Sequence, residues 1–455
     1  MLTLQEMTLL FEKSLETWPE TALKESLELE KKGADIIVYF LCGSYVADEI
    51  HVAHIAKCPL PDTIDAEVRD SSVIHNLSTN YDDLSKLLDL DWIVDHATKV
   101  LRMLPGGVTI VGITAICCKK VFTDQRLVLA SALKKTQNRA AALSTLDLAS
   151  FPSRMVLIHI DLTTKKMQTV ITDVVHRGPD SPSQVKYAQL KWISLVTRVA
   201  VDIRQAIDVI NEDDFYKEFT NAIKPWATSL HSSDTVYMFD DEFKDDAEAL
   251  VKDPKKMKNS NSVEVFMYMA SASSSEPKES AKIGEVFEVT FDLAVRATVP
   301  IKSSIAEAKR AINQHIIRQL MGRASLHYES MELQEEGRRA SPALHQFPRA
   351  ATTVIPSGGS LLVYDFLFEG DTADDAIKNF NALLSLKTST VEEIDELWER
   401  NLNEGEKEEP SLIIQHAHKL PEPDNSLSFC LILFGIIFLI IAIVVVAVVS
   451  TTGGS

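Results

Sequence analysis

A long uncharged stretch near the C-terminal end of the sequence constrains this chain most strongly. No charged side chain follows Asp424, and residues 427–449 are mostly Leu, Ile, Val and Phe. A helix over these residues reaches roughly 34 Å, which is enough to cross a hydrocarbon core about 30 Å thick. The sequence therefore predicts a single transmembrane helix. The apolar residues that define this predicted anchor include Leu427, Phe429, Leu431, Phe434, Ile437, Phe438, Ile441, Val445 and Val449.

The position of the predicted span sets an expected topology. Residues 1–20 contain several Glu residues and no basic segment ahead of an apolar run, so no signal peptide is indicated. Only residues 450–455 follow the span. We expect a tail-anchored protein with residues 1–425 in the cytosol and residues 450–455 as a short lumenal tail.

The charge balance and the cysteines exclude several classes of protein. The chain has 65 acidic and 46 basic residues, a net charge of -19, which argues against a nucleic-acid groove or strong affinity for anionic lipid. The cysteines show no CxxC pair, so neither a zinc cluster nor a disulfide framework is indicated, and no cofactor is predicted. They are Cys42, Cys58, Cys117, Cys118 and Cys430.

The apolar patterns of the first region, residues 1–176, alternate between helical and strand periods. Residues 1–32 have a helical period with an apolar stripe, whose polar face is acidic, so we expect it to pack internally and not on a membrane surface. Further helices are predicted over residues 91–103 and 123–146. Strands are predicted over residues 36–42, 49–56, 108–116, 155–160 and 166–171, of which the first two and the last two form hairpins.

A second α+β domain is predicted over residues 185–400, after a polar break at residues 177–184. Its predicted strands are residues 192–201, 263–270, 285–299, 353–355 and 361–368, and its predicted helices are residues 303–333 and 374–386. Residues 241–253 and 271–280 resemble mobile insertions. Residues 401–426, which are acidic and contain three prolines, are predicted to tether the body to the span.

Two histidines could suggest a metal site, but the alternation of side chains along a strand argues against it. His51 and His54 are three residues apart in a predicted strand, so their side chains point to opposite faces and are not expected to share a metal ion. Two glycine pairs, at residues 106–107 and 358–359, follow proline and precede apolar strands. Phosphate-binding loops need a longer glycine pattern, so we predict turns at both pairs.

Two adjacent cysteines could suggest a thiol nucleophile. Cys117 and Cys118 follow a predicted buried strand, and a nucleophile would need a partner base and an electropositive setting. The candidate bases, His96 and His159, show no special spacing. We therefore interpret these cysteines as packing residues and predict no catalytic residue.

Two stretches of the sequence carry a family resemblance. The first runs from Leu90 through Trp92 and His96 to the segment that ends in Gly106-Gly107 and the strand after it, and the second covers residues 354–376. These two stretches and the C-terminal span follow one another in the order found in the odorant response abnormal protein 4 family, which the chain resembles. The residues that carry the signature are Trp92, His96, Arg102, Leu104, Pro105, Gly106, Gly107, Pro356, Tyr364 and Phe366.

This resemblance implies an accessory factor that is not an enzyme. Members of the family help seven-helix odorant receptors to leave the endoplasmic reticulum toward sensory cilia. Members of the family also act as a membrane scaffold for the protease of the ubiquitin-fold modifier, and the resemblance implies the same role here. The partners implied for this chain are therefore odorant receptors, that protease, and the lipid bilayer around the C-terminal helix. The implied location is the membrane of the endoplasmic reticulum or of transport vesicles.

A more distant likeness concerns the N-terminal domain, residues 1–176. The order of strands and helix up to the Val111-Gly112 pair resembles metalloprotease-like MPN domains, whose active members carry zinc-binding histidines beyond that pair. The corresponding positions here hold Ala115 and Cys117. Because a methyl group cannot bind zinc, the likeness implies an MPN-like α/β domain without metal ligands, which serves as a docking platform.

Two other classes of protein compete with the scaffold interpretation. A SNARE-type fusion protein needs a long heptad coil that runs into the span. Here residues 401–426, which precede the predicted span, contain three prolines and many acidic residues. This composition excludes a SNARE-type protein whose coil continues directly into the span. A membrane-anchored hydrolase or isopeptidase that acts on ubiquitin-like conjugates is the stronger alternative, because such a site could lie in the second region.

Overall fold

A computed structural model describes the greater part of the chain up to residue 388. All described residues belong to a compact unit, Met1–Asn401. The predicted tether, transmembrane helix and lumenal tail lie outside them, as do Pro356, residues 271–280 and the glycine pair 358–359. Within the described part of the chain, no helix is both long and apolar enough to cross a membrane. The described ranges are 7–31, 35–60, 88–144, 151–176, 179–207, 215–230, 235–252, 261–269, 285–334, 348–355, 361–368 and 370–388.

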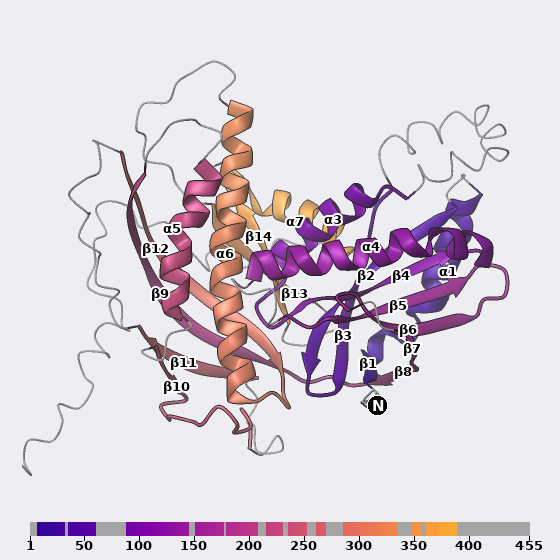
Figure 1. Ribbon diagram of the computed structural model, residues 1–455, viewed down its shortest axis with the longest axis horizontal. Coiled ribbons are helices and arrows are strands. Elements are labelled where there is room, and N and C mark those ends of the chain that lie inside the picture. Colours follow the sequence, from indigo (N-terminus) through magenta and orange to yellow (C-terminus); the bar gives the residue numbers. More distant parts are fainter. Residues whose placement is uncertain are drawn as a thin grey trace, which may run out of the picture. The chain divides into compact units, whose positions relative to one another are not determined.

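An eight-stranded mixed sheet, with strand order β7-β6-β5-β4-β2-β3-β1-β8, organises the N-terminal half of this unit (Figure 1). The predicted hairpins β2–β3 and β5–β6 are confirmed as antiparallel pairs, and β4 and β5 are parallel. Both edge strands, β7 and β8, are short. The strands are β1 (Thr8–Glu12), β2 (Ile36–Val46), β3 (Glu49–Lys57), β4 (Thr109–Cys117), β5 (Arg154–Asp161), β6 (Met167–Asp173), β7 (Ser181–Pro182) and β8 (Val185–Ala188).

Helices cover both faces of this sheet. Along β2, Ile37, Tyr39 and Leu41 face the side of α1 (Trp18–Glu30). Their neighbours Val38 and Phe40 face the opposite side, which α3 (Leu90–Met103) and α4 (Lys119–Ser144) cover. Side chains of a strand alternate between faces, so a strand that is buried on both sides reads as a continuous apolar run. The predicted helices 91–103 and 123–146 correspond to α3 and α4.

The prediction of one helical segment over residues 1–32 is wrong at its start. Residues Thr8–Glu12 form β1, which pairs in parallel with both β3 and β8, and a short 3-10 turn, η1 (Lys13–Leu15), separates it from α1. Leu9 and Phe11 point into the core from alternate positions, with exposed fractions of 0% and 2%. A short apolar run is compatible with both periods, and pairing with two distant strands decides between them. The expected internal packing of this segment is confirmed.

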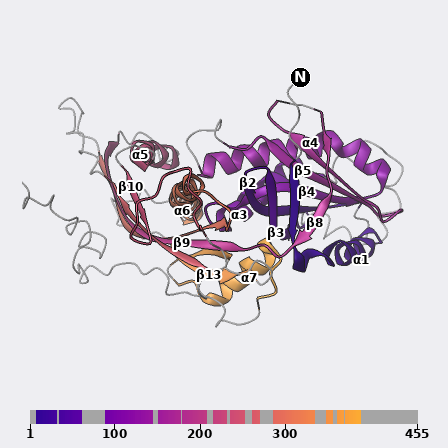
Figure 2. The same cartoon turned by 90° about the horizontal axis from the view of Figure 1, so that it is seen from below.

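A second, four-stranded sheet has the order β10-β11-β9-β12 and contains two long antiparallel strands, β9 and β12. The helices α5 and α6 pack against it, and α6 also contacts α3 and α4 (Figures 1 and 2). The predictions of β9, β11, β12 and α6 are confirmed, whereas α5 and β10 were not predicted. The elements are β9 (Trp192–Ile207), α5 (Phe215–Leu230), β10 (Val236–Phe239), β11 (Ser262–Tyr268), β12 (Glu285–Pro300) and α6 (Ile305–Gln334).

The stretch after β10, predicted as a mobile insertion, is held to the start of α6 as far as residue 252. The backbone N–H of Leu250 donates to the carbonyl of Ser303 at 2.9 Å, and that of Ile305 donates to the carbonyl of Glu248 at 2.9 Å. The acidic composition of this stretch suggested mobility. Backbone hydrogen bonds to a distant segment, which no local pattern reveals, fix it instead.

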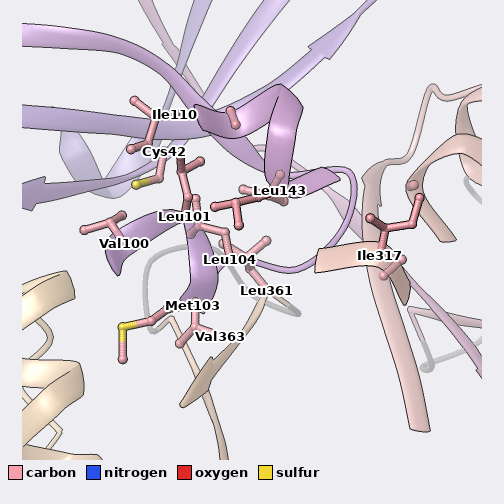
Figure 3. Packing of buried hydrophobic residues seen from close by; sticks show 14 of the residues in the cluster. Cys42, Val100, Leu101, Met103, Leu104, Ile110, Leu143, Ile317, Leu361 and Val363 are labelled. Atoms are coloured by element: carbon pink, nitrogen blue, oxygen red, sulfur yellow. The ribbon is translucent and has the colours of Figure 1, made fainter. Parts of the chain in front are cut away.

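A hairpin and a helix complete the described unit, as predicted. The hairpin consists of β13 (Arg349–Val354) and β14 (Leu362–Leu367), and α7 (Ala373–Leu384) packs against it. One hydrophobic core connects these elements to the rest: Leu101 of α3, Ile110 of β4, Ile317 of α6 and Val363 of β14 belong to the same cluster (Figure 3). The described residues therefore share a core that extends from the eight-stranded sheet to α6 and β14.

Candidate functional site around the Pro105–Gly107 turn

Helix α6 carries an unusual set of buried polar side chains on one face. His315, Arg318, Gln319 and Arg323 have exposed fractions of 0–1%, although their side chains are charged or strongly polar. Residues three, four and eight apart lie on the same side of a helix. Buried polar groups are costly unless they are hydrogen-bonded, so this face of α6 must have specific partners.

The partners of Arg318 are backbone carbonyls of the segment between α3 and β4. Its Nη1 donates to the carbonyl oxygens of Leu104 at 2.9 Å, Pro105 at 2.9 Å and Val108 at 2.8 Å. Its Nε and Nη2 donate to the Oγ of Ser144 at 3.1 and 2.6 Å. Burial lowers the pKa of Arg318 to about 10, so the guanidinium remains charged at neutral pH. Arg318 therefore ties α6 to both ends of the α3–β4 segment and to the end of α4.

The predicted turn at the glycine pair is confirmed, and it has a tertiary role. The N–H of Val108 donates to the carbonyl of Pro105 at 3.2 Å, and Gly107 has a φ of +85°. A Cβ atom on Gly106 would lie 2.1 Å from the carbonyl oxygen of Ala311 in α6. A Cβ on Gly107 would lie 2.2 Å from the carbonyl oxygen of Thr298 in β12. Only glycine allows α6 and β12 to approach the turn this closely.

Hydrogen bonds at the turn fix the state of His315. The N–H of Gly106 donates to Nδ1 of His315 at 3.1 Å, and its carbonyl accepts from the N–H of Thr298 at 2.8 Å. Burial, followed by the nearby guanidinium groups of Arg318 and Arg323, lowers the pKa of His315 well below its usual value. The imidazole is therefore neutral and carries its proton on Nε2.

Three more signature residues approach the same helix. Nη2 of Arg102 donates to the Oγ of Ser325 at 2.7 Å and to Oε1 of Glu329 at 2.9 Å, both on α6. The ring of Tyr364 lies 4.9 Å from that of His315, and its hydroxyl donates to the carbonyl of Arg296 in β12 at 2.8 Å. The guanidinium of Arg323 lies 4.9 Å above the ring of Phe366. The signature from Arg102 to Gly107 thus meets that of β14 on one face of α6.

The two remaining described signature residues lie elsewhere. Nε1 of Trp92 donates to the carbonyl of Pro59 at 2.8 Å, at the wall of a small apolar pocket. The ring of His96 stacks on Phe40 with centroids 5.9 Å apart and lies toward the backbone of Leu383 in α7. Burial lowers the pKa of His96 to about 4. These two side chains secure the ends of β3 and α7 against α3, separately from the α6 junction.

Residues that suggested catalysis or metal binding are occupied by structural contacts. Ala115 and Cys117 both lie in β4 with 0% exposure, and burial raises the pKa of the Cys117 thiol far above neutrality. Nε2 of His159 donates to the carbonyl of Cys117 at 3.1 Å, and its ring stacks on Phe122 at 4.0 Å. Cys118 is partly exposed at the start of α4. His159 thus contacts the backbone of Cys117 and does not act on its thiol.

The two histidines of β3 lie on the same face of the sheet, so their predicted opposite orientation is wrong. The register with β2 shifts between Cys42 and Gly43, which leaves Ala53 as an extra residue between the histidines and interrupts the alternation of side chains. His51 contacts Trp192 and His54 contacts Leu384, both of the cluster beneath α3 and α4, but their hydrogen-bond partners differ. Nε2 of His51 lies 2.8 Å from Oε2 of Glu49, and Nε2 of His54 donates to the carbonyl of Leu384 at 2.5 Å. Among the residues that the structure describes, no group of three His, Cys, Asp or Glu side chains could hold a metal ion.

Sequence reasoning missed the residues of α6 that receive the signature. Ile312, Ile316 and Leu320 recur with a helical period, and all three are buried. Polar residues beside them would ordinarily indicate the solvent-facing side. The only local indication of buried polar groups was the presence of Arg318 and Arg323 among the many apolar residues of this helix. The arrangement as a whole consists of backbone acceptors, a neutral imidazole and guanidinium groups, which hold α3, β4, β14 and α6 together.

Comparisons with known proteins agree with the signature. The model of the family described as "Odorant response abnormal 4-like" matches residues 39–395. "Odorant response abnormal protein 4" of Caenorhabditis elegans is 35% identical over 444 residues, which cover 94% of this chain and 89% of the relative. "Protein odr-4 homolog" of Homo sapiens is 24% identical over 338 residues, which cover 69% of this chain and 72% of the relative.

Among solved structures, a chain titled "Crystal structure of UfSP from C.elegans" aligns with a TM-score of 0.42 and 8% identity. The alignment covers 84% of this chain and 56% of that one. A likeness at this level carries no argument about activity. The family model and the nematode relative, by contrast, extend over most of the sequence, and the chain belongs to the Odorant response abnormal 4-like family.

Proposed function

We propose that this chain is an accessory factor for the trafficking of odorant receptors and is not an enzyme. The observation that carries the proposal is its 35% identity, over 94% of its length, to a nematode protein whose name describes an abnormal odorant response. The protein promotes the folding of seven-helix odorant receptors, their exit from the endoplasmic reticulum and their delivery to sensory cilia.

Attachment to the membrane is part of the proposed mechanism. Residues 427–449 anchor the chain, residues 401–426 form a tether, and the body stands on the cytosolic side. Anchoring confines the body to a thin layer near the bilayer, which raises its effective concentration toward membrane-embedded clients. The net charge of -19 and the uncharged C-terminal segment support attachment through the anchor and not through binding of the body to anionic lipid.

The body acts as a scaffold in this proposal. Residues 1–176 form an MPN-like domain without metal ligands, residues 185–400 form the second domain, and the protease of the ubiquitin-fold modifier is a partner that the chain recruits to the membrane. Two observations support a role without catalysis: the Cys117 thiol is buried and protonated, and His159 is engaged with a backbone carbonyl. The signature residues around Gly106 stabilise the platform.

Replacement of the Caenorhabditis elegans relative by this chain tests the proposal. We expect the full chain to restore the delivery of a fluorescently tagged odorant receptor to cilia. Removal of residues 427–455 should abolish delivery while the body still folds, and an unrelated tail anchor in their place should restore it. Normal receptor delivery by the soluble truncated chain would show that tethering is not required.

A hydrolase that acts on ubiquitin-like conjugates is the alternative. Purified full-length chain, incubated with conjugates of the ubiquitin-fold modifier, should show no cleavage with or without a chelator. The variants Cys117→Ser and Cys118→Ser provide matched controls for a thiol mechanism. Cleavage that a chelator or Cys118→Ser removes would replace the scaffold by an enzyme.

A further inference from the structure

The outer face of α4 differs in charge from the rest of the protein. The helix contains six basic residues and a single acidic residue, Asp124, in a chain whose net charge is -19. In an acidic protein, a basic helix face is unexpected unless something acidic approaches it. The basic residues of α4 are Lys119, Lys120, Arg126, Lys134, Lys135 and Arg139.

The exposed residues of α4 form one continuous stripe. They recur every three or four positions, as expected for the solvent side of a helix whose other side is buried. Figures 1 and 2 show α4 along one face of the eight-stranded sheet. Its buried side packs against β4 and β5 of that sheet. We call this stripe the α4 outer face; it comprises Lys119, Lys120, Thr123, Asp124, Leu127, Ser131, Lys134, Lys135, Asn138, Arg139 and Ala142.

Part of this positive charge has no counter-charge in the described part of the chain. Lys135 pairs with Asp91 at 2.8 Å, and Arg126 pairs with Asp180. Among the described residues, Lys134 and Arg139 have no ion-pair partner. Exposed charges act within about one screening length, roughly 8 Å at physiological salt, so a partner at this face meets the basic stripe before the distant acidic surface.

An exposed leucine lies on the same stripe as these charges. Leu127 has an exposed fraction of 81%, the largest among the large apolar side chains that the structure describes. It lies seven positions, or two helical turns, before Lys134, which corresponds to about 10 Å along the helix. A leucine that faces water contributes nothing to the core, whereas it gains free energy when a partner's apolar side chain covers it. An apolar contact flanked by opposite charges is the usual composition of a protein interface.

We propose that the α4 outer face is a docking surface for an acidic segment of a partner protein that also carries an apolar side chain. Carboxylates of the segment pair with Lys134 and Arg139, and its apolar side chain covers Leu127. The distance from Leu127 to Arg139 is twelve positions, or about 18 Å along the helix. A segment of about twelve residues spans it if the segment is helical, and one of about six residues if it is extended.

Two other classes of ligand fit this face less well. A membrane surface binds helices that present a broad apolar side, but the apolar side of α4, including Leu129 and Leu133, is already buried in the protein. A nucleic acid is a long polyanion that would experience the whole field of a chain with a net charge of -19. A short acidic segment experiences only the local stripe.

Site-specific crosslinking in the native membrane tests the inference. A photoreactive amino acid replaces Ser131, at the centre of the α4 outer face, in the full-length chain. As a matched control it replaces Lys24, which is exposed on α1 at the opposite face of the same sheet. We expect crosslinks from position 131, above the level from position 24, to protein segments in which Asp and Glu outnumber Lys and Arg.

Charge reversal then separates docking from chance proximity. Lys134→Glu combined with Arg139→Glu should lower the crosslink yield at least fivefold, whereas Lys24→Glu combined with Lys31→Glu should leave it unchanged. If the reversed variant melts more than a few degrees below the wild type, the milder pair Lys134→Gln and Arg139→Gln should lower the yield at least twofold. Lipid adducts, segments without an acidic surplus, or yields insensitive to these substitutions would overturn the inference.

The inference goes beyond the proposed function, because the acidic segment can belong to any partner. A failure of receptor delivery with normal crosslinking would count against the proposed function alone. Absence of the crosslink from position 131 of the otherwise unchanged chain, with normal receptor delivery, would count against the α4 outer face alone.

Discussion

Arg318 offers the sharpest test of the junction between α6 and the family signature. Its side chain is 1% exposed and donates to three backbone carbonyls and to the hydroxyl of Ser144. The substitution Arg318→Met keeps most of the apolar stem and removes every one of these donors. Because methionine fills a similar volume, the expected effect comes from lost hydrogen bonds and not from a large cavity.

The magnitude follows from the groups left behind. A hydrogen bond to a charged donor contributes about 1.5–3 kcal/mol, and Arg318→Met removes several that share one guanidinium. These contributions are not additive, because the three carbonyls can partly readjust together. We expect a loss of about 3–5 kcal/mol in the free energy of unfolding, which corresponds to about two such hydrogen bonds after this readjustment.

Urea unfolding of the full-length chain in detergent, followed by tryptophan fluorescence, measures this loss. Arg310→Met is the matched control: it makes the same change at an exposed position of the same helix and should stay within about 0.5 kcal/mol of the wild type. Arg318→Lys, which keeps the charge but not the fork of donors, should fall between the two. A loss below about 1 kcal/mol for Arg318→Met would refute the network reasoning, because it would be smaller than the contribution of a single hydrogen bond from a charged donor.

Three further predictions concern the packing and the pH dependence of stability. Gly106→Ala should cost about 3 kcal/mol in urea unfolding, because its Cβ would lie 2.1 Å from a carbonyl oxygen of α6, whereas Gly322→Ala, whose nearest neighbour would be 3.5 Å away, should cost nothing. His96 has a pKa of about 4 when folded and a higher one when unfolded, so the unfolded state binds more protons between those values. Stability should therefore fall as the pH drops from about 6.5 to 4, and melting curves of His96→Gln should show a weaker decline; an equal decline would contradict the assignment. Burial raises the pKa of Asp365 to about 6, so its charged form destabilises the fold above that pH. Asp365→Asn should raise the melting temperature at pH 7 and have little effect at pH 4, and a decrease at pH 7 would show that the carboxylate is needed there.

Several elements could be predicted because their determinants are local. The helix at Leu90–Met103 has a clear amphipathic period, an aspartate cap at Asp89 and a proline-glycine stop after it. The hairpin β2–β3 could be predicted from two apolar runs separated by a short turn. The turn at Gly106-Gly107 was predicted for the same reason. In each case the signal lies within about fifteen residues of the sequence.

Other features depend on contacts between distant segments. Thr8–Glu12 forms a strand because β3 and β8 lie on either side of it, and neither neighbour is visible in its own sequence. The edge strand β7 lies in a polar stretch that indicated only a break between domains, and the edge strand β8 follows it directly. A short strand gains its hydrogen bonds from its neighbours, so its formation is decided by the sheet.

The sequence by itself determined the α+β composition, the predicted membrane anchor and the family signature, because periodicity, charge and short motifs are properties of neighbouring residues. Only the tertiary structure decided what the signature does. Tyr364 is far from Arg102 and Gly106 in the sequence, and all three meet on α6, where a polar helix face that resembled a solvent-facing one is buried. The physical reason is that a buried donor must find its acceptor in space, and backbone carbonyls of a distant turn leave no mark in the sequence of the helix that binds them.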